Sequence, residues 1–493
     1  CFSESYKKLD KKREVLYSEF TTNQKEGLLM NQIVTDIVKI INNNPTLIEI
    51  EMDLETYFAE KISDLFSQAI ERVDLELIQE YKENGYEIDR IEKRTVQFGF
   101  GATELRRRRM RKKGEKSVVP LDTAIGLDKR KRYSPLVEMK AASLASDSVY
   151  RKVADAIELL TPLSISHGTI HSMTQRIGEV IQNWTDEAPL HDETPLRDKK
   201  KVPVLFIEGD GLMLKGREKK RPELHRVQIH EGVTTHLKRS TLVNSMLFES
   251  VESSQKAFER AGKWIEKNYD LRNTIIISNS DGGSGYEKDK FEAIIGQTKR
   301  HEHFRDAYHV NRKIKERLSF DKKMSGIMIK TIKSYDWDKV LSVLDTAESR
   351  IDDPEKEAEY LEQIDKLKQY LNRNWKSIKP LKLRNLPILK GLGVCESNHR
   401  PFSYRMKRQG RGFTKKGAGN LAAVISARRN GTFILAITTV LPTFKEVTDQ
   451  FKGAVRNALK KAPIQASRGA ISGSIVNYGS TSSPMGRLNK MFS

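Results

Sequence analysis

Two carboxylates that follow apolar runs are the residues best placed to do chemistry. Asp210 comes shortly after Val202–Ile207, a run of six apolar residues, and Asp281 comes shortly after three consecutive isoleucines. Such runs predict short strands buried on both faces. Gly209 and Gly211 flank the first acid, and we expect them to let the backbone turn there. Strands that deliver two acids to one open edge of a sheet are a way of building a metal site.

A third acid, Glu396, is isolated in the sequence. No other Asp or Glu occurs between Asp365 and Glu446, and several Arg and Lys residues follow Glu396 closely. These basic residues could pair with Glu396, or they could line a helix that runs beside a DNA backbone. We assign Arg405, Lys407 and Arg408 to DNA binding.

Asp306 and His309 form a further pair near the acids. Their spacing of three residues would place both side chains on one face of a helix, where they could bind metal or position a substrate. An ordinary surface pair is the alternative. Lys215 and His309, together with Arg405, are candidates for contact with phosphates.

The elements around the two acids follow from apolar periodicity. His225–Thr235 and Ser240–Val251 are predicted strands, and Ser254–Asn268 has the apolar spacing of a helix. The order of strand, strand, strand, helix and strand is the order that a ribonuclease-H-like domain requires. Gly431–Val440 is predicted as one more strand, and Phe444–Lys461 as a basic helix.

The composition favours a polyanionic partner. The 493 residues include 87 Lys and Arg against 66 Asp and Glu, which gives a net charge of +21. Neutralisation of phosphates and release of counterions would drive such a chain onto nucleic acid, although a generally basic protein is the alternative. The densest basic run is Leu105–Lys116, read as a phosphate-contacting segment or as a solvated hairpin. The residues of this run assigned to DNA are Arg106, Arg107, Arg108, Arg109, Arg111 and Lys112.

A helix-turn-helix is predicted between Ser148 and Asn183. Tyr150–Leu160 would form its first helix, and Ser166 would cap a second helix that presents His167 and Thr169 to a DNA groove. An ordinary pair of antiparallel helices fits the same pattern.

Some classes of protein are disfavoured. Two cysteines supply neither a disulfide framework nor a cysteine-based zinc site, which fits a reducing interior. No stretch approaches the roughly 20 apolar residues of a membrane span. We therefore expect a cytoplasmic protein that associates with DNA and has no membrane partner.

The motifs together resemble a known family. FIEGDG, SNSDGGSGY, HFRDAYHVNRKIKERL and CESNHRPFSYRMKRQGRGFTKKGAGNLA resemble, in this order, transposases of bacterial ISLre-type insertion sequences, which look like distant relatives of the Mutator-like DDE transposases. The resemblance covers roughly residues 95–430 and implies that Asp210, Asp281 and Glu396 form a DDE triad. In Mutator-like relatives a cysteine and a histidine follow the second Asp. Here Asp306 replaces the cysteine, so that pair's role does not carry over directly.

The resemblance also implies the chemistry. Two Mg²⁺ ions about 4 Å apart, with Mn²⁺ as a substitute, would be held by the three acids, with Asp210 bridging both. Ends of the element would be cut by hydrolysis and joined to target DNA by transesterification. Double-stranded DNA and further copies of the chain, assembled on paired ends, would be the partners. Two alternatives stay open: a nuclease of the same fold that only hydrolyses, and a non-catalytic DNA-binding remnant.

The expected fold is an α/β catalytic core, with a ribonuclease-H-like mixed sheet, flanking helices and an all-helical insertion, after a mainly α-helical N-terminal DNA-binding region. The expected domains are a helical N-terminal region (1–93), a basic and helix-turn-helix-like region (94–185), the catalytic domain (200–318 and 381–430), the helical insertion (319–380), and a C-terminal segment with a flexible tail (431–493).

Overall fold

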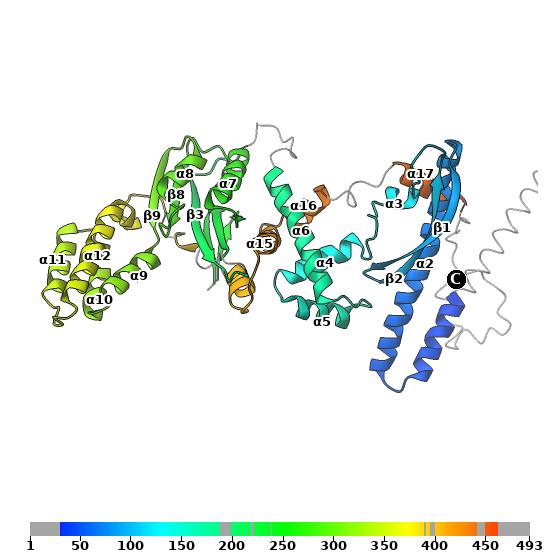
Figure 1. The fold of residues 1–493 in the computed structure, drawn as a ribbon, viewed down its shortest axis with the longest axis horizontal. Helices are drawn as coiled ribbons and strands as arrows, with labels where there is room; N and C mark the ends of the chain where they lie inside the picture. The colour runs from blue at the N-terminus through cyan, green and yellow to red at the C-terminus, as the bar shows by residue number, and fades with distance from the viewer. Residues whose placement is uncertain are drawn as a thin grey trace, which may run out of the picture. The chain divides into compact units, whose positions relative to one another are not determined.

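The structure, a computed structural model, divides the chain into two compact units (Figure 1). It describes residues 30–187, 199–217, 221–237, 239–388, 391–394, 400–440 and 449–461. The first unit comprises Cys1–Arg94, Glu104–Ala124 and Val447–Ser493, and the second comprises Thr95–Thr103 and Ile125–Glu446.

A long helix and a basic hairpin form the described core of the first unit. Helix α2 spans Leu47–Glu83 and begins with a capping box, in which Thr46 and Glu49 satisfy each other's backbone N–H groups. Residues 30–43 are also helical, and further elements are β1 (Glu87–Phe98), β2 (Gly101–Arg111), α3 (Pro120–Ala124) and α17 (Asp449–Lys461). Strands β1 and β2 pair with each other, and α17 packs along α2.

A five-stranded mixed sheet is the centre of the second unit. Its strands are β3 (Val204–Met213), β4 (Glu223–His230), β7 (Met246–Ser250), β8 (Ile275–Ser280) and β9 (Arg300–Arg305), in the order β7-β4-β3-β8-β9. Strand β3 is antiparallel to β4 and parallel to β8. Strand β7 is antiparallel to β4, and β9 is parallel to β8. The first acid-bearing strand therefore lies in the middle of the sheet.

Each of the two strands predicted between the acids is divided in the structure. Strand β4 ends at His230 and a small hairpin follows, formed by β5 (Gly232–His236) and β6 (Arg239–Val243). Asn244, at a positive φ of 46°, separates this hairpin from β7. Strand β9 was not predicted from the sequence. The alternation of side chains in β9 is short and mostly polar, which is why apolar periodicity missed it.

Helices cover both faces of the sheet. On one face, Leu205 and Ile207 pack against α7 (Ser254–Asn268) and α8 (Lys288–Ile295). On the other face, Leu212 and Leu214 pack against α15 and Phe402. The elements of that face are α14 (Arg400–Phe402), the π-helical turn η5 (Ser403–Lys407) and α15 (Lys415–Arg429). Successive strand residues alternate between faces, so Asp210 belongs to the α15 face.

A helical insertion follows β9 and has a core of its own. It consists of α9 (Ala307–Arg317), α10 (Lys322–Thr331), α11 (Trp337–Glu348) and α12 (Glu357–Ile378), with short 3-10 turns η3 (Ile332–Ser334) and η4 (Leu381–Leu383). Helix α9 contributes Val310 and Ile314 to this core, so the insertion starts before residue 319, the start expected from the sequence, and directly after the sheet.

Helices α4 (Pro135–Ala145), α5 (Tyr150–Leu160) and α6 (His167–Glu187) precede the sheet. Helix α6 packs so closely on α15 that a methyl group at Gly178 would lie 2.2 Å from the Asn420 carbonyl oxygen. Every described helix is too short or too polar to cross a bilayer.

The strand predicted for Gly431–Val440 is wrong, because Phe433–Val440 forms helix α16. Phe433, Ala436 and Ile437 are buried with helical spacing in one cluster with residues of α6 and α15. The expected helix over Phe444–Lys461 appears as α17 in its described part, and residues 441–448 lie outside the described residues, as does the expected tail.

Candidate functional site

Asp210 sits within strand β3, not at its end as the sequence suggested, because β3 continues to Met213. The flanking glycines therefore do not turn the chain. A methyl group at Gly209 would lie 2.8 Å from Tyr286 Cδ1, and one at Gly211 would lie 2.3 Å from Glu223 Oε1. Glycine is needed at both positions to admit neighbouring side chains on the face opposite to Asp210.

Backbone and aromatic contacts fix Asp210. Its carboxylate oxygen Oδ1 accepts a hydrogen bond from the Gly211 N–H at 2.7 Å. The buried Tyr286 hydroxyl donates to the Asp210 carbonyl at 3.0 Å and lies 2.9 Å from His225 Nδ1. Asp210 itself is 9% exposed, so its carboxylate is held at the edge of the core with a small opening to solvent.

Asp281 follows β8 directly, in a turn that needs glycine. The Gly283 N–H donates to Asp281 Oδ1 at 2.8 Å. Gly282 has a φ of +77°, and a methyl group there would overlap the Arg305 guanidinium, 1.2 Å from Nη1. Backbone conformation and the close approach of Arg305 both require glycine at position 282.

Asp306 follows β9 and caps α9. Its Oδ1 accepts hydrogen bonds from the N–H groups of Tyr308 and His309, at 2.9 and 3.2 Å. Asn279 Nδ2 donates to its Oδ2 at 3.4 Å. Asp306 therefore precedes the helix instead of sharing a helical face with His309, and the cap is what brings the pair together.

The three aspartates meet at one small pocket. The parallel register pairs Gly209 of β3 with Ser280, the last residue of β8, so the next residues of the two segments, Asp210 and Asp281, are neighbours. Asp306 reaches the same place from β9, and His309 Nδ1 lies 3.8 Å from Asp281 Oδ2. The pocket is lined by Gly209, Asp210, Asn279, Ser280, Asp281, Asp306 and His309.

Glu396 lies outside the described residues, but the chain is anchored near the pocket on both sides of it. A methyl group at Gly393 would lie 3.6 Å from Asp306 Oδ2. After Glu396, Phe402 is fully buried, and its ring lies 5.1 Å from the guanidinium of Arg226. Arg226 on β4 is the residue opposite Asp210 in the antiparallel register of β3 and β4.

The donor chemistry of the pocket suits a hard cation, because carboxylate oxygens are the ligands that Mg²⁺ prefers. In the described part of the chain, no three His, Cys, Asp or Glu side chains come close enough to form a complete ligand set. The pocket aspartates could supply carboxylate ligands to a cation, but they do not form a complete set among the described residues.

Comparison with known proteins identifies the family. Residues 40–439 match the family described as "Uncharacterised protein family (UPF0236)". The chain belongs to this family. It is 41% identical over 460 residues to the "UPF0236 protein in vanSb 3'region" of Streptococcus gallolyticus, a match that covers 93% of this chain and 99% of that protein.

A second relative shows that UPF0236 proteins recur within one genome. It is a UPF0236 protein of Caldanaerobacter subterraneus subsp. tengcongensis, 24% identical over 391 residues that cover 77% of this chain and 78% of the relative. Its name joins eleven loci, from TTE0033 to TTE2212. Another UPF0236 protein of that organism, named for two loci, is 24% identical over 434 residues that cover 83% of each chain.

The basic run of this UPF0236 chain is heavily paired. All six of the residues that the sequence assigns to DNA in β2 and just after it have an acid within ion-pair distance. The pairs are Arg106 with Glu71, Arg107 with Asp122, Arg108 with Asp74, Arg109 with Glu92, Arg111 with Asp89 and Lys112 with Glu115. Arg108 is the most enclosed of them, at 8% exposure.

The other residues assigned to DNA or phosphate differ in exposure. Arg405 is 1% exposed, and its Nε donates to the Ala145 carbonyl at 2.8 Å, so its guanidinium has a packing role between η5 and α4. The residues that do face solvent are His167, Lys215, Lys407 and Arg408, and Thr169 is half-buried.

Two residues near the pocket were missed from the sequence. Asn279 hydrogen-bonds Asp306, and Arg305 packs against the turn that carries Asp281. Burial lowers the pKa of the Arg305 guanidinium, and its Nε and Nη1 have no hydrogen-bond partner among the described residues. The only sequence signal for either residue was its position beside a candidate acid.

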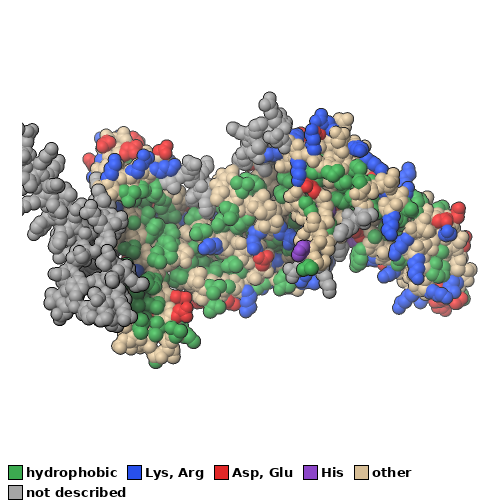
Figure 2. Space-filling model, turned by 180° about the vertical axis from the view of Figure 1, so that it is seen from behind, with side chains coloured by type: hydrophobic (Ala, Val, Ile, Leu, Met, Phe, Trp, Pro, Cys, Tyr) green, Lys and Arg blue, Asp and Glu red, His purple; other side chains and the backbone are tan. Residues whose placement is uncertain are grey.

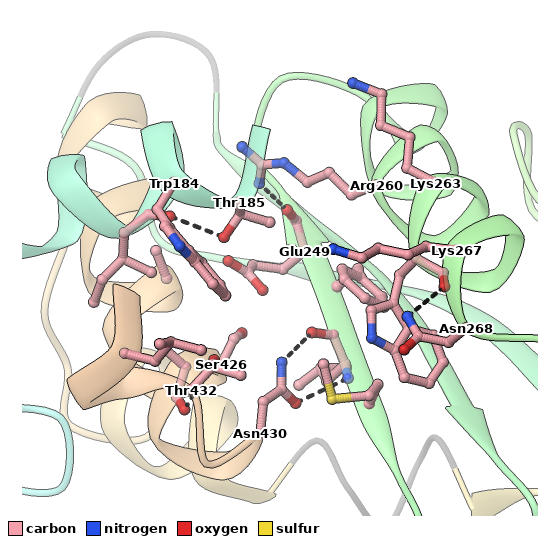
Figure 3. Close-up of a pocket in the computed structure, with 18 of the residues that line it drawn as sticks. Trp184, Thr185, Glu249, Arg260, Lys263, Lys267, Asn268, Ser426, Asn430 and Thr432 are labelled. Carbon is pink, nitrogen blue, oxygen red and sulfur yellow. Dashed lines mark hydrogen bonds between the residues drawn. The ribbon is translucent and has the colours of Figure 1, made fainter. Parts of the chain in front are cut away.

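A larger cavity of about 440 Å³ lies apart from these acids, between α6, β7, α7, α15 and α16 (Figure 3). Its polar groups contact the protein itself. Asn430 exchanges two hydrogen bonds with the backbone of Leu247, and Arg260 Nη1 donates to the Glu249 carbonyl. Burial raises the pKa of the Glu249 carboxyl, which opens onto this space (Figure 3). These contacts tie the helices to β7.

Proposed function

We propose that this UPF0236 protein is a DDE transposase of a bacterial insertion sequence, which cuts and joins DNA with Asp210, Asp281 and Glu396. The observation that carries the proposal is the position of two acids on one mixed sheet. Asp210 lies on the central strand, and Asp281 directly follows the neighbouring parallel strand. Both line one pocket.

The strand order supports a ribonuclease-H-like core. Taken in sequence order, the five strands are arranged 3-2-1-4-5, with the second antiparallel to the first and the fourth parallel to it. That is the order which such a domain requires. The helical insertion separates this sheet from Glu396, as the resemblance to ISLre-type transposases implies.

The pocket residues would divide the work as follows. Asp210, Asp281 and Glu396 would hold two Mg²⁺ ions, which when bound activate the attacking oxygen and stabilise the leaving oxygen at phosphorus. The Gly211 and Gly283 N–H groups orient the first two carboxylates. His309, beside Asp281, would contact a phosphate oxygen or hold the Asp281 carboxylate in place.

The genomic recurrence of relatives agrees with a mobile element. A UPF0236 protein whose name joins eleven loci of one genome is expected when a gene copies itself or moves with its element. Double-stranded DNA would be the substrate, and several copies of the chain would act on the paired ends.

The test is metal-dependent cleavage and joining of a labelled duplex that carries the element's own ends. With Mg²⁺ or Mn²⁺, the wild-type protein should cut the ends and join them to a target. Asp281→Asn should lower the rate by at least about 100-fold, because loss of a metal ligand removes several kcal/mol of transition-state stabilisation.

Asp289→Asn is the matched control. Asp289 lies on α8 close in sequence, its side chain is 66% exposed, and it is not a pocket residue. The same chemical change there should leave the rate within about twofold. Cleavage without joining would favour the hydrolytic nuclease. Salt-sensitive DNA binding with neither reaction would favour the non-catalytic remnant, and equal rates for both variants would reject the triad.

A further inference from the structure

The helical insertion carries a cationic groove that the sequence did not reveal. The groove lies between α9 and α12 and has a volume of about 470 Å³. Lys313 and Arg317 line it from α9, and Lys366, Tyr370 and Arg373 line it from α12. The described residues that form its wall include no carboxylate.

The charges of this groove remain available to an anion. Among the described residues, Lys313 and Lys366 pair with exposed acids of their own helices, at 3.3 and 2.6 Å, and such pairs contribute little in water. Arg317 donates to the neutral side chain of Gln363, and its charge contributes to lowering the pKa of the exposed Glu362 carboxyl. Arg373 is exposed and has no acid within ion-pair distance in the described part of the chain.

The spacing of the cations favours a polyanion. Lys366, Tyr370 and Arg373 follow one another at four and three residues on one face of α12. Lys366 and Arg373 are therefore about 10 Å apart along the helix axis. Lys313 and Arg317 line the facing side one helical turn apart. Charges repeated along two walls suit a chain of phosphates better than a single one.

One end of the groove adjoins the acidic pocket. Asn374, the residue after Arg373, accepts a hydrogen bond from Arg305 Nη2, and Arg305 immediately precedes Asp306. Burial raises the pKa of the Tyr370 hydroxyl, while the charges of Arg305 and Arg373 lower it and those of Asp281 and Asp306 raise it. Tyr370, which lines the groove, is therefore close enough to feel the charges of both the acids and Arg373.

We propose that the α9–α12 groove binds the phosphate backbone of the DNA that enters the acidic pocket. This inference rests on the proposed function, since it assigns a path to the same substrate. Lys and Arg side chains are spread over the visible face of the described residues, so a net charge alone does not single out this groove (Figure 2). What distinguishes it is the convergence of four cations from two helices beside the candidate site.

The experiment compares two double variants by fluorescence anisotropy of a labelled DNA duplex, in EDTA so that no cleavage occurs. Lys366→Gln/Arg373→Gln removes two groove cations. We expect its affinity to fall about tenfold, and the slope of log K against log salt to become shallower by about 2.

Lys323→Gln/Lys339→Gln is the matched control. It removes the same charge from α10 and α11 of the same insertion, at exposed positions outside the groove. We expect affinity within about twofold of wild type and an unchanged slope. Both variants should keep the thermal midpoint of the wild type.

Equal losses in the two variants, or none in the groove variant, would overturn the groove as a DNA path. The joining assay separates this failure from that of the proposed function. If wild type joins ends and the groove variant binds and joins as well as wild type, the groove inference alone is wrong. If wild type does not bind the duplex at all, both are wrong.

Discussion

The molecule has two cationic regions. One is dense in sequence but paired with acids in the structure, and the other is dispersed in sequence but gathered in one groove. Strand β2 and the residue after it hold the densest basic run in the chain, yet its assigned Arg and Lys residues all lie within ion-pair distance of Asp or Glu side chains. The α9–α12 groove draws its cations from two helices separated in sequence by two others, and its wall among the described residues is free of acids.

The difference teaches that charge density along a sequence is a poor measure of the charge a surface offers. In a two-stranded hairpin, alternate side chains face opposite sides. Arg106 and Arg108 therefore meet Glu71 and Asp74 of α2, while Arg109 meets Glu92 of β1. We infer that the hairpin arginines act mainly on stability and the groove cations mainly on affinity.

The sharpest test of this contrast is a pair of identical substitutions, Arg108→Ala and Arg373→Ala. Asp74 is completely buried and is bonded by Arg108 Nη1 at 2.8 Å. Arg108→Ala removes this ion pair and leaves Asp74 Oδ2 with the backbone N–H of residue 108 at 3.2 Å, and we expect the free energy of unfolding to fall by about 3 kcal/mol. Arg373→Ala should change it by less than about 0.5 kcal/mol. Urea unfolding followed by circular dichroism measures both.

The double variant Asp74→Leu/Arg108→Met supplies the control. It replaces the buried pair with apolar side chains, and a well-packed replacement should stay within about 1 kcal/mol of wild type. If Arg108→Ala proves as mild as Arg373→Ala, the hairpin arginine is not a structural residue and the contrast fails.

The same distinction explains what the sequence could predict. Apolar runs predicted the strands that lead to the two acids, because a central strand buried on both faces consists of consecutive apolar residues. The pairing of the arginines could not be predicted, because it depends on which acids of α2 and β1 face them. The glycines at positions 209 and 211 were expected to let the backbone turn. They are needed instead to make room for side chains from distant segments, which the sequence around them does not show.

The pocket could be predicted only where its residues are close together in the sequence. Asp306 and His309 are close in sequence, so their spacing drew attention, although a helix cap and not a shared face relates them. Helix α16 was mistaken for a strand, because the apolar run Phe433–Ile437 is too short for its period to be read without its packing partners. The groove has no local signal at all.

A second, smaller effect concerns the stability that the Glu92–Arg109 ion pair contributes, which should be lost at acidic pH. The hydrogen bond from Arg109 lowers the pKa of the Glu92 carboxyl to about 2. Because the folded pKa lies below the unfolded value of about 4.3, this stabilisation is complete above that pH and disappears as the pH falls toward 2. We expect wild type to be more stable than Glu92→Gln by about 1 kcal/mol at pH 6, after allowance for solvent screening, and to lose most of that advantage by about pH 2.5. Unfolding midpoints across this range measure it. A gap that does not depend on pH would show that the ion pair is not its source.

The smallest expected effect is a gain in binding. Glu92 accepts two hydrogen bonds from the Arg109 guanidinium, at 2.7 and 3.2 Å, and Glu92→Gln removes the charge that holds it. If the acids of this region are what keep its arginines from DNA, the variant should bind a labelled duplex about two- to threefold more tightly, with a salt slope steeper by up to about 1. Glu104→Gln is the matched control, because Glu104 lies on the partner strand β2 of the same hairpin but pairs with Lys93, whose side chain is already 65% exposed. An increase in both variants would reflect net charge alone. An increase in Glu92→Gln only would mean that the hairpin holds a reserve of positive charge that its own acids neutralise, whereas the groove presents its charge without any such change.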